Sequence, residues 1–143
     1  MADPIAREPC IFCRIVAKEI PCYKVYEDKK CLAFLDINPV NPGHLLVIPK
    51  AHYKTITDMP RKLCEHLAGV VWTLSLKVQQ ELDPDGIKVV QNNNEQAGQV
   101  VPHYHVHVIP RYEGDRDHYI EEWKTRKLDE GQMKEIQEKI KSH

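Results

Sequence analysis

The feature that most constrains this chain is a run near its C-terminal third, from His103 to Arg111, with the sequence HYHVHVIPR. Histidine alternates there with bulky, mostly β-branched residues. A period of two predicts a β-strand, because successive side chains of a strand point to opposite faces. The face of histidines would hold His103, His105 and His107, and the face packed on a core would hold Tyr104, Val106 and Val108. We expect Pro110 to end the strand, because it has no N–H for the ladder.

Three imidazoles in register indicate chemistry more than a chance row on a solvent-facing strand. The residues alone leave two functional interpretations open, a metal site and nucleophilic catalysis by a histidine. Residues 91–99, QNNNEQAGQ, lead directly into the histidine run. Such a loop is by itself usually only a turn. Beside three histidines it favours the nucleophile, because amides and exposed backbone N–H groups can hold an anion without a metal.

These motifs together resemble the histidine triad family of nucleotide-binding hydrolases and transferases. The signature of that family, three histidines alternating with hydrophobic residues, matches residues 103–109 apart from the aromatic Tyr104. Residues 10–16 (CIFCRIV) are similar to the family's opening helix, and residues 32–37 (LAFLDI) and 42–50 (PGHLLVIPK) are similar to its central strands. The resemblance covers about Cys10 to Arg111 almost without gaps, and the Cys-x-x-Cys motif is that of its microbial branch.

The pattern of apolar residues and turn formers predicts an α+β fold. We expect strands at residues 23–27, 31–36, 44–48, 87–90 and 103–109, hence an antiparallel sheet of about five strands. One long helix would have Asp58 as its N-cap and Pro60 in its first turn, and it would stop at residues 83–86. A short N-terminal helix at residues 10–18 and a C-terminal helix at 130–141 complete the set, with the helices gathered on one side. The family resemblance implies the same fold.

Length and composition limit the number of domains and the kinds of partner. A chain of 143 residues predicts a single domain at 10–143, with a loose tail at 1–9, a core at 10–111 and a C-terminal segment at 112–143. A net charge of −1 implies no broad affinity for nucleic acid or membranes. No apolar run reaches the roughly 18 residues of a membrane span, and no leader precedes Cys10. We therefore expect a cytoplasmic protein without nucleic-acid or membrane partners.

The resemblance assigns roles to the histidines. His105 would attack the α-phosphorus of a nucleotide and form a covalent nucleotidyl-histidine, which water then opens. His107 would contact the same phosphate, and His44 would support the orientation of the nucleophile, together with His103. Taken alone, His44 could equally be a structural histidine. The implied substrates are nucleoside phosphoramidates, dinucleoside polyphosphates or related conjugates of AMP or GMP.

The resemblance also implies a nucleotide site. Gln99 and the backbone of Gly98 and Val100 would hold phosphate oxygens, and Asn92 matches an amide near the reacting phosphate. Asp36 would accept from the ribose hydroxyls, since its two oxygens suit a cis-diol; the alternative is an exposed turn carboxylate. Apolar residues would line a base pocket, namely Phe12, Ile15, Phe34, Leu35 and Ile37.

One position departs from the family pattern. Residue 100 is usually Ser or Thr in this family, whereas here it is Val100, which has no hydroxyl for the leaving atom. We expect slower turnover or a different leaving group. The departure also keeps open a purine-nucleotide-binding module with negligible turnover. A further alternative makes the three histidines a catalytic metal centre.

The Cys-x-x-Cys pair, Cys10 and Cys13, predicts metal or redox chemistry more than a structural disulfide. In the microbial branch this motif resembles half of a structural zinc site, whose other ligands would here be His52 and His103. A closed Cys₂His₂ set would brace the fold, perform no chemistry and fix the ring of His103. The alternative is a reduced, metal-free pair. The resemblance implies no catalytic cofactor, and it implies a homodimer whose sheets run together across the two-fold axis.

Overall fold

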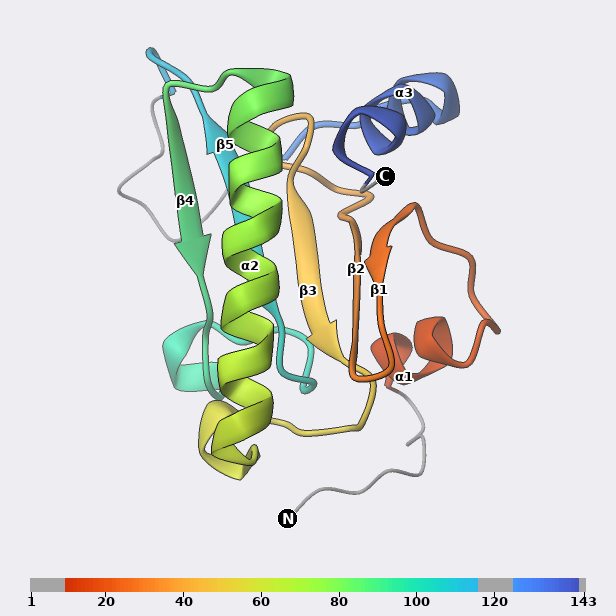
Figure 1. Cartoon of the computed structure of the whole chain (residues 1–143), viewed down its shortest axis with the longest axis vertical. Coiled ribbons are helices and arrows are strands. Elements are labelled where there is room, and N and C mark those ends of the chain that lie inside the picture. Colours follow the sequence, from red (N-terminus) through yellow and green to blue (C-terminus); the bar gives the residue numbers. More distant parts are fainter. Residues whose placement is uncertain (1–9, 116–124, 142–143) are drawn as a thin grey trace.

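The structure is a computed structural model that describes residues 10–115 and 125–141, so the tail predicted at 1–9 lies outside the described residues. Five strands form one sheet in the order β1-β2-β3-β5-β4 (Figure 1). All neighbouring strands run antiparallel, as predicted. The strands are β1 (Lys24–Glu27), β2 (Cys31–Leu35), β3 (Leu45–Pro49), β4 (Gly86–Val90) and β5 (Val106–Arg111).

Helices cover both faces of the sheet, which corrects the expectation that they gather on one side. α2 (Arg61–Leu82) and α3 (Glu130–Ile140) join the larger core on one face. α1 (Ile11–Val16) joins a smaller core on the other. Within β2, Ala33 belongs to the larger core and Phe34 to the smaller one. The sequence of β2 is apolar throughout, so it has no polar face that could indicate which side a helix covers.

The long helix is confirmed, but its predicted start is wrong. Asp58 ends a short 3-10 turn (Ile56–Asp58), where its Oδ2 accepts from the N–H and the hydroxyl of Thr55 at 3.1 and 2.9 Å. α2 begins at Arg61, after the extended Pro60. The residues of α2 buried against the sheet are Leu67, Val70, Leu74 and Val78, as the apolar period predicts. Among the described helices, none is long and apolar enough to cross a membrane.

β5 continues through Pro110 to Arg111, so the expectation that Pro110 ends the strand is wrong. β3 pairs with β5 only from Val106 to Val108, and the missing N–H of Pro110 therefore removes no bond to β3. His107 lies in β5 between two neighbouring strands, opposite Leu46 of β3 and Val90 of β4. The histidine run therefore ends in an internal strand of the sheet.

Candidate active site

The three histidines of the run lie on the face of the sheet that α1 covers. The ring of Phe12 in α1 stands edge-on to the rings of His103 and His105, with centroids 5.8 and 5.2 Å away. The rings of His105 and His107 are 4.9 Å apart. The intervening side chains are buried in the larger core on the opposite face, namely Tyr104, Val106 and Val108. The predicted alternation is confirmed, although only His107 belongs to the ladder of β5.

The main chain holds His105 in one tautomer. Its Nδ1 lies 2.7 Å from the carbonyl oxygen of His103, and since a carbonyl can only accept, Nδ1 carries the proton. Nε2 therefore keeps its lone pair. Burial lowers the pKa of His105, against the opposing effect of the hydrogen bond to His103, so the ring is neutral at pH 7. A neutral imidazole with one fixed lone pair can act as a nucleophile.

A pair of hydrogen-bonded imidazoles, those of His44 and His107, lies next to His105. The backbone N–H of Val40 donates to Nδ1 of His44 at 3.0 Å, which leaves the proton of His44 on Nε2. That Nε2 donates to Nδ1 of His107 at 2.9 Å, so the proton of His107 lies on its own Nε2. Burial, followed by repulsion from His105, lowers the pKa of both His44 and His107 to about 3. At neutral pH both rings are uncharged. His107, which lines the cavity, then carries its N–H on Nε2.

A tight turn and a carboxylate position His44. Gly43 adopts a φ of +97°, and a Cβ at this position would collide with the side chain of Leu82, so only glycine fits. The N–H of Asp36 donates to the carbonyl of His44 at 2.9 Å, and Oδ2 of Asp36 lies 3.6 Å from Nε2 of His44. Burial raises the pKa of Asp36, against a hydrogen bond from the N–H of Asn38.

These side chains open into a cavity of about 670 Å³. Most of the residues predicted for the catalytic and nucleotide sites line it, namely Phe12, Asp36, Ile37, His44, Asn92, Gly98, Val100, His105 and His107. His44, His105 and His107 are called the pocket histidines below. Residues as far apart in the sequence as Phe12 and His107 thus lie together in the folded chain.

Several predicted residues do not line the cavity. Phe34 lies in the smaller core, edge-on to Phe12 with ring centroids 5.7 Å apart, and Ile15 is in the same core. Leu35 packs in the larger core, so its placement in a base pocket is wrong: consecutive residues of β2 face opposite ways. Gln99 is buried, and it donates from Nε2 to the carbonyl of Lys54 and accepts at Oε1 from the N–H of Asn94, both at 2.7 Å.

The loop before the histidine run is shaped by its own hydrogen bonds. Gly98 has a φ of +95°, and its N–H already donates to the carbonyl of Glu95 at 2.9 Å. The amide of Asn92 donates to the carbonyl of Gly98 at 3.5 Å. The side chain of Val100 is 89% exposed and stands at the cavity. The loop is thus held next to the pocket histidines, while the N–H of Gly98 and the amide of Gln99, both predicted to hold phosphate oxygens, bond within the chain.

Sequence reasoning missed other lining residues, which are Ile11, Asn38, Leu46, Lys88, Val90, Val101 and Thr125. Two of them had a usable signal. Lys88 and Val90 share the strand parity of Asn92, so they belong on the same face once β4 is placed beside β5.

A second group of side chains, called the Cys-His cluster below, consists of Cys10, Cys13, His52 and His103. Cys10 is the N-cap of α1, and its Sγ accepts from the N–H of Cys13 at 3.3 Å. Sγ of Cys10 lies 3.3 Å from Nδ1 of His103, and Sγ of Cys13 lies 3.2 Å from Nδ1 of His52. The two Nδ1 atoms are 3.2 Å apart. The four residues predicted as zinc ligands therefore converge.

The donor atoms of the Cys-His cluster fit a tetrahedral metal. Zinc bonds of 2.0–2.3 Å place ligand atoms about 3.3–3.8 Å apart, close to the separations of these atoms. Nε2 of His103 lies 2.9 Å from the carbonyl oxygen of Pro49 and so carries the proton, which leaves the Nδ1 lone pair directed at the cysteines. Two thiols and two imidazoles form a closed set, suited to bracing a fold.

The three histidines of the run do not form one metal centre. His103 groups with the cysteines, His107 groups with His44 and Asp36, and His105 belongs to neither set of convergent donors among the described residues. The catalytic-metal interpretation of the run therefore lacks a common ligand point. His103 instead connects the two groups, since its ring faces the cysteines while its carbonyl orients His105.

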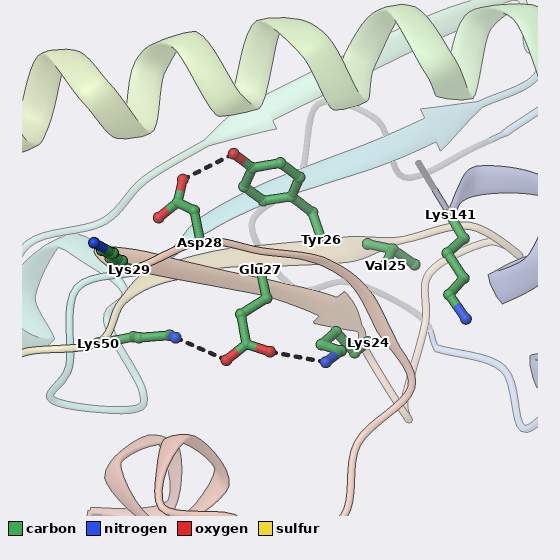
Figure 2. A pocket seen from close by; sticks show the side chains of 8 residues that line it. All are labelled: Lys24, Val25, Tyr26, Glu27, Asp28, Lys29, Lys50 and Lys141. Carbon is green, nitrogen blue, oxygen red and sulfur yellow. Dashed lines mark hydrogen bonds and ion pairs between the residues drawn. The ribbon is translucent and has the colours of Figure 1, made fainter. Parts of the chain in front are cut away.

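A second hollow, of similar volume, lies beside β1 and shares no described lining residue with the first (Figure 2). Two of its lysines pair with one carboxylate: Glu27 accepts from Lys24 at 2.8 Å and from Lys50 at 2.7 Å, as the dashed lines in Figure 2 show. These hydrogen bonds, first that from Lys24, lower the pKa of Glu27 to about 2. The described residues of this lining include no histidine or cysteine, so the cavity at the pocket histidines is the candidate active site.

Comparisons with known proteins agree with this geometry. A family model for the HIT domain matches residues 17–114. An uncharacterized HIT-like protein of Methanocaldococcus jannaschii is 53% identical over 107 residues, which cover 74% of this chain and 81% of the relative. An adenosine 5′-monophosphoramidase of Schizosaccharomyces pombe is 42% identical over 102 residues, which cover 71% of this chain and 74% of the relative.

A solved structure extends the comparison to the fold. The crystal structure of a zinc-bound histidine triad family protein from Mycobacterium smegmatis superposes with a TM-score of 0.80 at 34% identity, over 92% of this chain and 90% of that one. The likeness thus extends over most of the chain.

Proposed function

The chain belongs to the histidine triad family, and on that premise we propose that it cleaves nucleotide conjugates at the α-phosphorus through a covalent nucleotidyl-histidine on His105. One observation carries the proposal: the carbonyl of His103 fixes the Nδ1 proton of His105 and leaves the Nε2 lone pair in a cavity lined by His44 and His107. The phosphoramidase from S. pombe supports the choice of phosphoramidate substrates.

The reaction is a pair of displacements. The lone pair on Nε2 of His105 forms a bond to the α-phosphorus, and the bond from phosphorus to the leaving group breaks with its electron pair on that group. The N–H on Nε2 of His107 stabilises the negative charge that develops on the phosphate oxygens. The leaving nitrogen takes a proton from solvent as its bond to phosphorus breaks, so it departs as a neutral amine. Water then attacks phosphorus, the electron pair returns to Nε2 of His105, and the spare proton of that water returns to solvent. Two displacements replace one difficult step.

The nucleoside would lie on the β2 side of the cavity. The carboxylate of Asp36 accepts from the ribose hydroxyls, and Phe12 and Ile37 contact a purine base. Ile37 is 65% exposed, and ligand binding would cover it. Asn92, Gly98 and Val100 lie along the phosphate, and Gln99 braces their loop from behind. The substrate class is conjugates of AMP or GMP.

We also propose that the Cys-His cluster binds a structural zinc ion. The zinc-bound mycobacterial relative supports this assignment, as does the tetrahedral spacing of the donor atoms. Bound zinc would hold α1, His52 and the start of the histidine run together. The main-chain carbonyl of His103 would be held with them, so the cluster positions His105 without touching substrate.

A homodimer is proposed from one edge of the sheet. Among the described strands, β4 pairs only with β5, so its outer edge can accept another strand. Val89 of β4 is 52% exposed, and Trp72 and Leu76 of α2 are 68% and 44% exposed. Apolar side chains beside an open edge favour a two-fold interface there. Light scattering should give twice 16.6 kDa, and Trp72→Glu should shift it toward the monomer.

Trapping the intermediate tests the proposed reaction. Rapid quench of the protein with adenosine phosphoramidate, followed by peptide mass spectrometry, should find an AMP adduct on His105. The alternative, a binding module with negligible turnover, is favoured by Val100, which offers no hydroxyl to the leaving atom. Tight AMP binding with neither adduct nor product would decide for that module.

A further inference from the structure

Lys88 is the one lysine or arginine among the described residues that line the cavity. It is half-buried in β4, two residues from Val90, which pairs directly with His107. Residues two apart on a strand share a face, so Lys88 stands on the histidine face as a diagonal neighbour of His107. Diagonal neighbours of an antiparallel pair lie about 7–8 Å apart, a distance that a lysine side chain spans.

The strand order fixes which charged side chain lies at each end of the cavity. Asp36 follows β2, His44 precedes β3, His107 is in β5 and Lys88 is in β4. The sheet order β2-β3-β5-β4 therefore places the carboxylate and the ammonium on opposite sides of the pocket histidines. A substrate with its ribose at Asp36 and its α-phosphorus at His105 extends its leaving group toward Lys88.

The other described ionisable side chains of the cavity supply no positive charge at neutral pH, which makes Lys88 important. Burial holds the pKa of His44 and His107 at about 3, so neither ring is cationic at neutral pH. Asp36 can contribute only negative or no charge. The ammonium of Lys88 is thus the fixed positive charge among the described lining residues, and it lies at the leaving-group end.

We infer that Lys88 selects the leaving group, and that the preferred conjugates carry an anion, such as a carboxylate, beside the bond that breaks. The inference rests on the proposed function and specifies its substrate class. Lys88 is a binding residue here, because its ammonium contacts the anion and takes no part in bond breaking. Lys88 already has an interaction within the chain, and the anion competes with it. The gain in affinity for an anionic leaving group is therefore limited.

Two matched substrates test this. AMP joined through nitrogen to glycine and AMP joined to glycinamide share the scissile P–N bond, and the far end of the leaving group is a carboxylate in the first and a neutral amide in the second. Because glycine is also the more basic leaving amine, the wild-type ratio of kcat/KM for the two conjugates serves as the reference preference. Lys88→Met should lower kcat/KM for that conjugate by about fivefold to tenfold, and leave glycinamide within about twofold. Lys88→Arg should restore the preference, and Lys62→Met, which removes an exposed lysine outside the cavity, should not alter it.

The outcomes separate this inference from the proposed function. Equal losses on both conjugates, or no loss on either, would overturn the role of Lys88 while leaving the hydrolase intact. If the wild type cleaves neither conjugate, the proposed reaction fails, and affinity decides the inference. In that case Lys88→Met in a His105→Ala background should weaken binding of the glycine conjugate alone, and equal binding of both would refute it.

Discussion

His103 and His105 are two residues apart, and each donates one N–H to a main-chain carbonyl, yet they donate from different ring nitrogens. His103 donates from Nε2 to the carbonyl of Pro49, and its Nδ1 lone pair faces Cys10 and Cys13. His105 donates from Nδ1 to the carbonyl of His103, and its Nε2 lone pair remains for the cavity. The nitrogen that donates decides where the lone pair points, and therefore whether the ring is suited to ligate a metal or to attack phosphorus.

Replacing His105 tests the reactive half of this comparison with the largest expected effect. His105→Ala removes the nucleophile, so kcat on an AMP phosphoramidate should fall by roughly a thousandfold or more. The free energy of unfolding, measured in urea, should change far less than the activity. Retained turnover in His105→Ala would eliminate the covalent mechanism.

Zinc addition tests the structural half. At zinc concentrations 100- to 1,000-fold above Kd, the free energy of unfolding should rise by about 2.7–4.1 kcal/mol, because the folded state alone has the complete site. The double variant Cys10→Ser, Cys13→Ser should lose this gain. Cys22→Ser, which alters a half-buried cysteine outside the cluster, should keep it. An equal gain in all three proteins would place the zinc elsewhere.

The pocket histidines should make the fold sensitive to acid. The pKa of His44 and His107 is about 3 when folded, against an ordinary value of 6.5 when unfolded. Between these values the unfolded chain binds more protons, so stability falls as pH falls, by up to about 1.4 kcal/mol per pH unit for each histidine. Above pH 6.5 neither ring contributes. NMR titration should show both rings neutral at pH 5, and a midpoint near 6.5 would contradict the buried, neutral pair.

Val100 gives the smallest expected effect. Val100→Ser adds a hydroxyl at an exposed position of the cavity, and kcat should rise by about threefold to tenfold through a hydrogen bond to the leaving atom. Val100→Ala controls for loss of bulk, since it has no hydroxyl. A rate that stays equal or falls in the serine variant would mean that residue 100 does not limit turnover.

Local patterns predicted most of the framework. The five strands, the long helix and the division between histidine and core faces all follow from periods of two and 3.6 residues, because side-chain direction along a strand or helix is a local property. Non-local partners were less predictable. The helix start was misjudged because Thr55 takes the carboxylate of Asp58, and Leu35 was misplaced because a wholly apolar strand conceals its faces.

By itself, the sequence determined that three imidazoles share one face of a strand and that two cysteines begin a helix. Only the tertiary structure decided what each imidazole can do. The carbonyl of Pro49, 54 residues from His103 in the chain, selects the donating nitrogen of that ring, and the placement of β4 beside β5 brings Lys88 to the cavity. Tautomers and pocket charges depend on hydrogen bonds and burial between distant segments, which no local pattern contains.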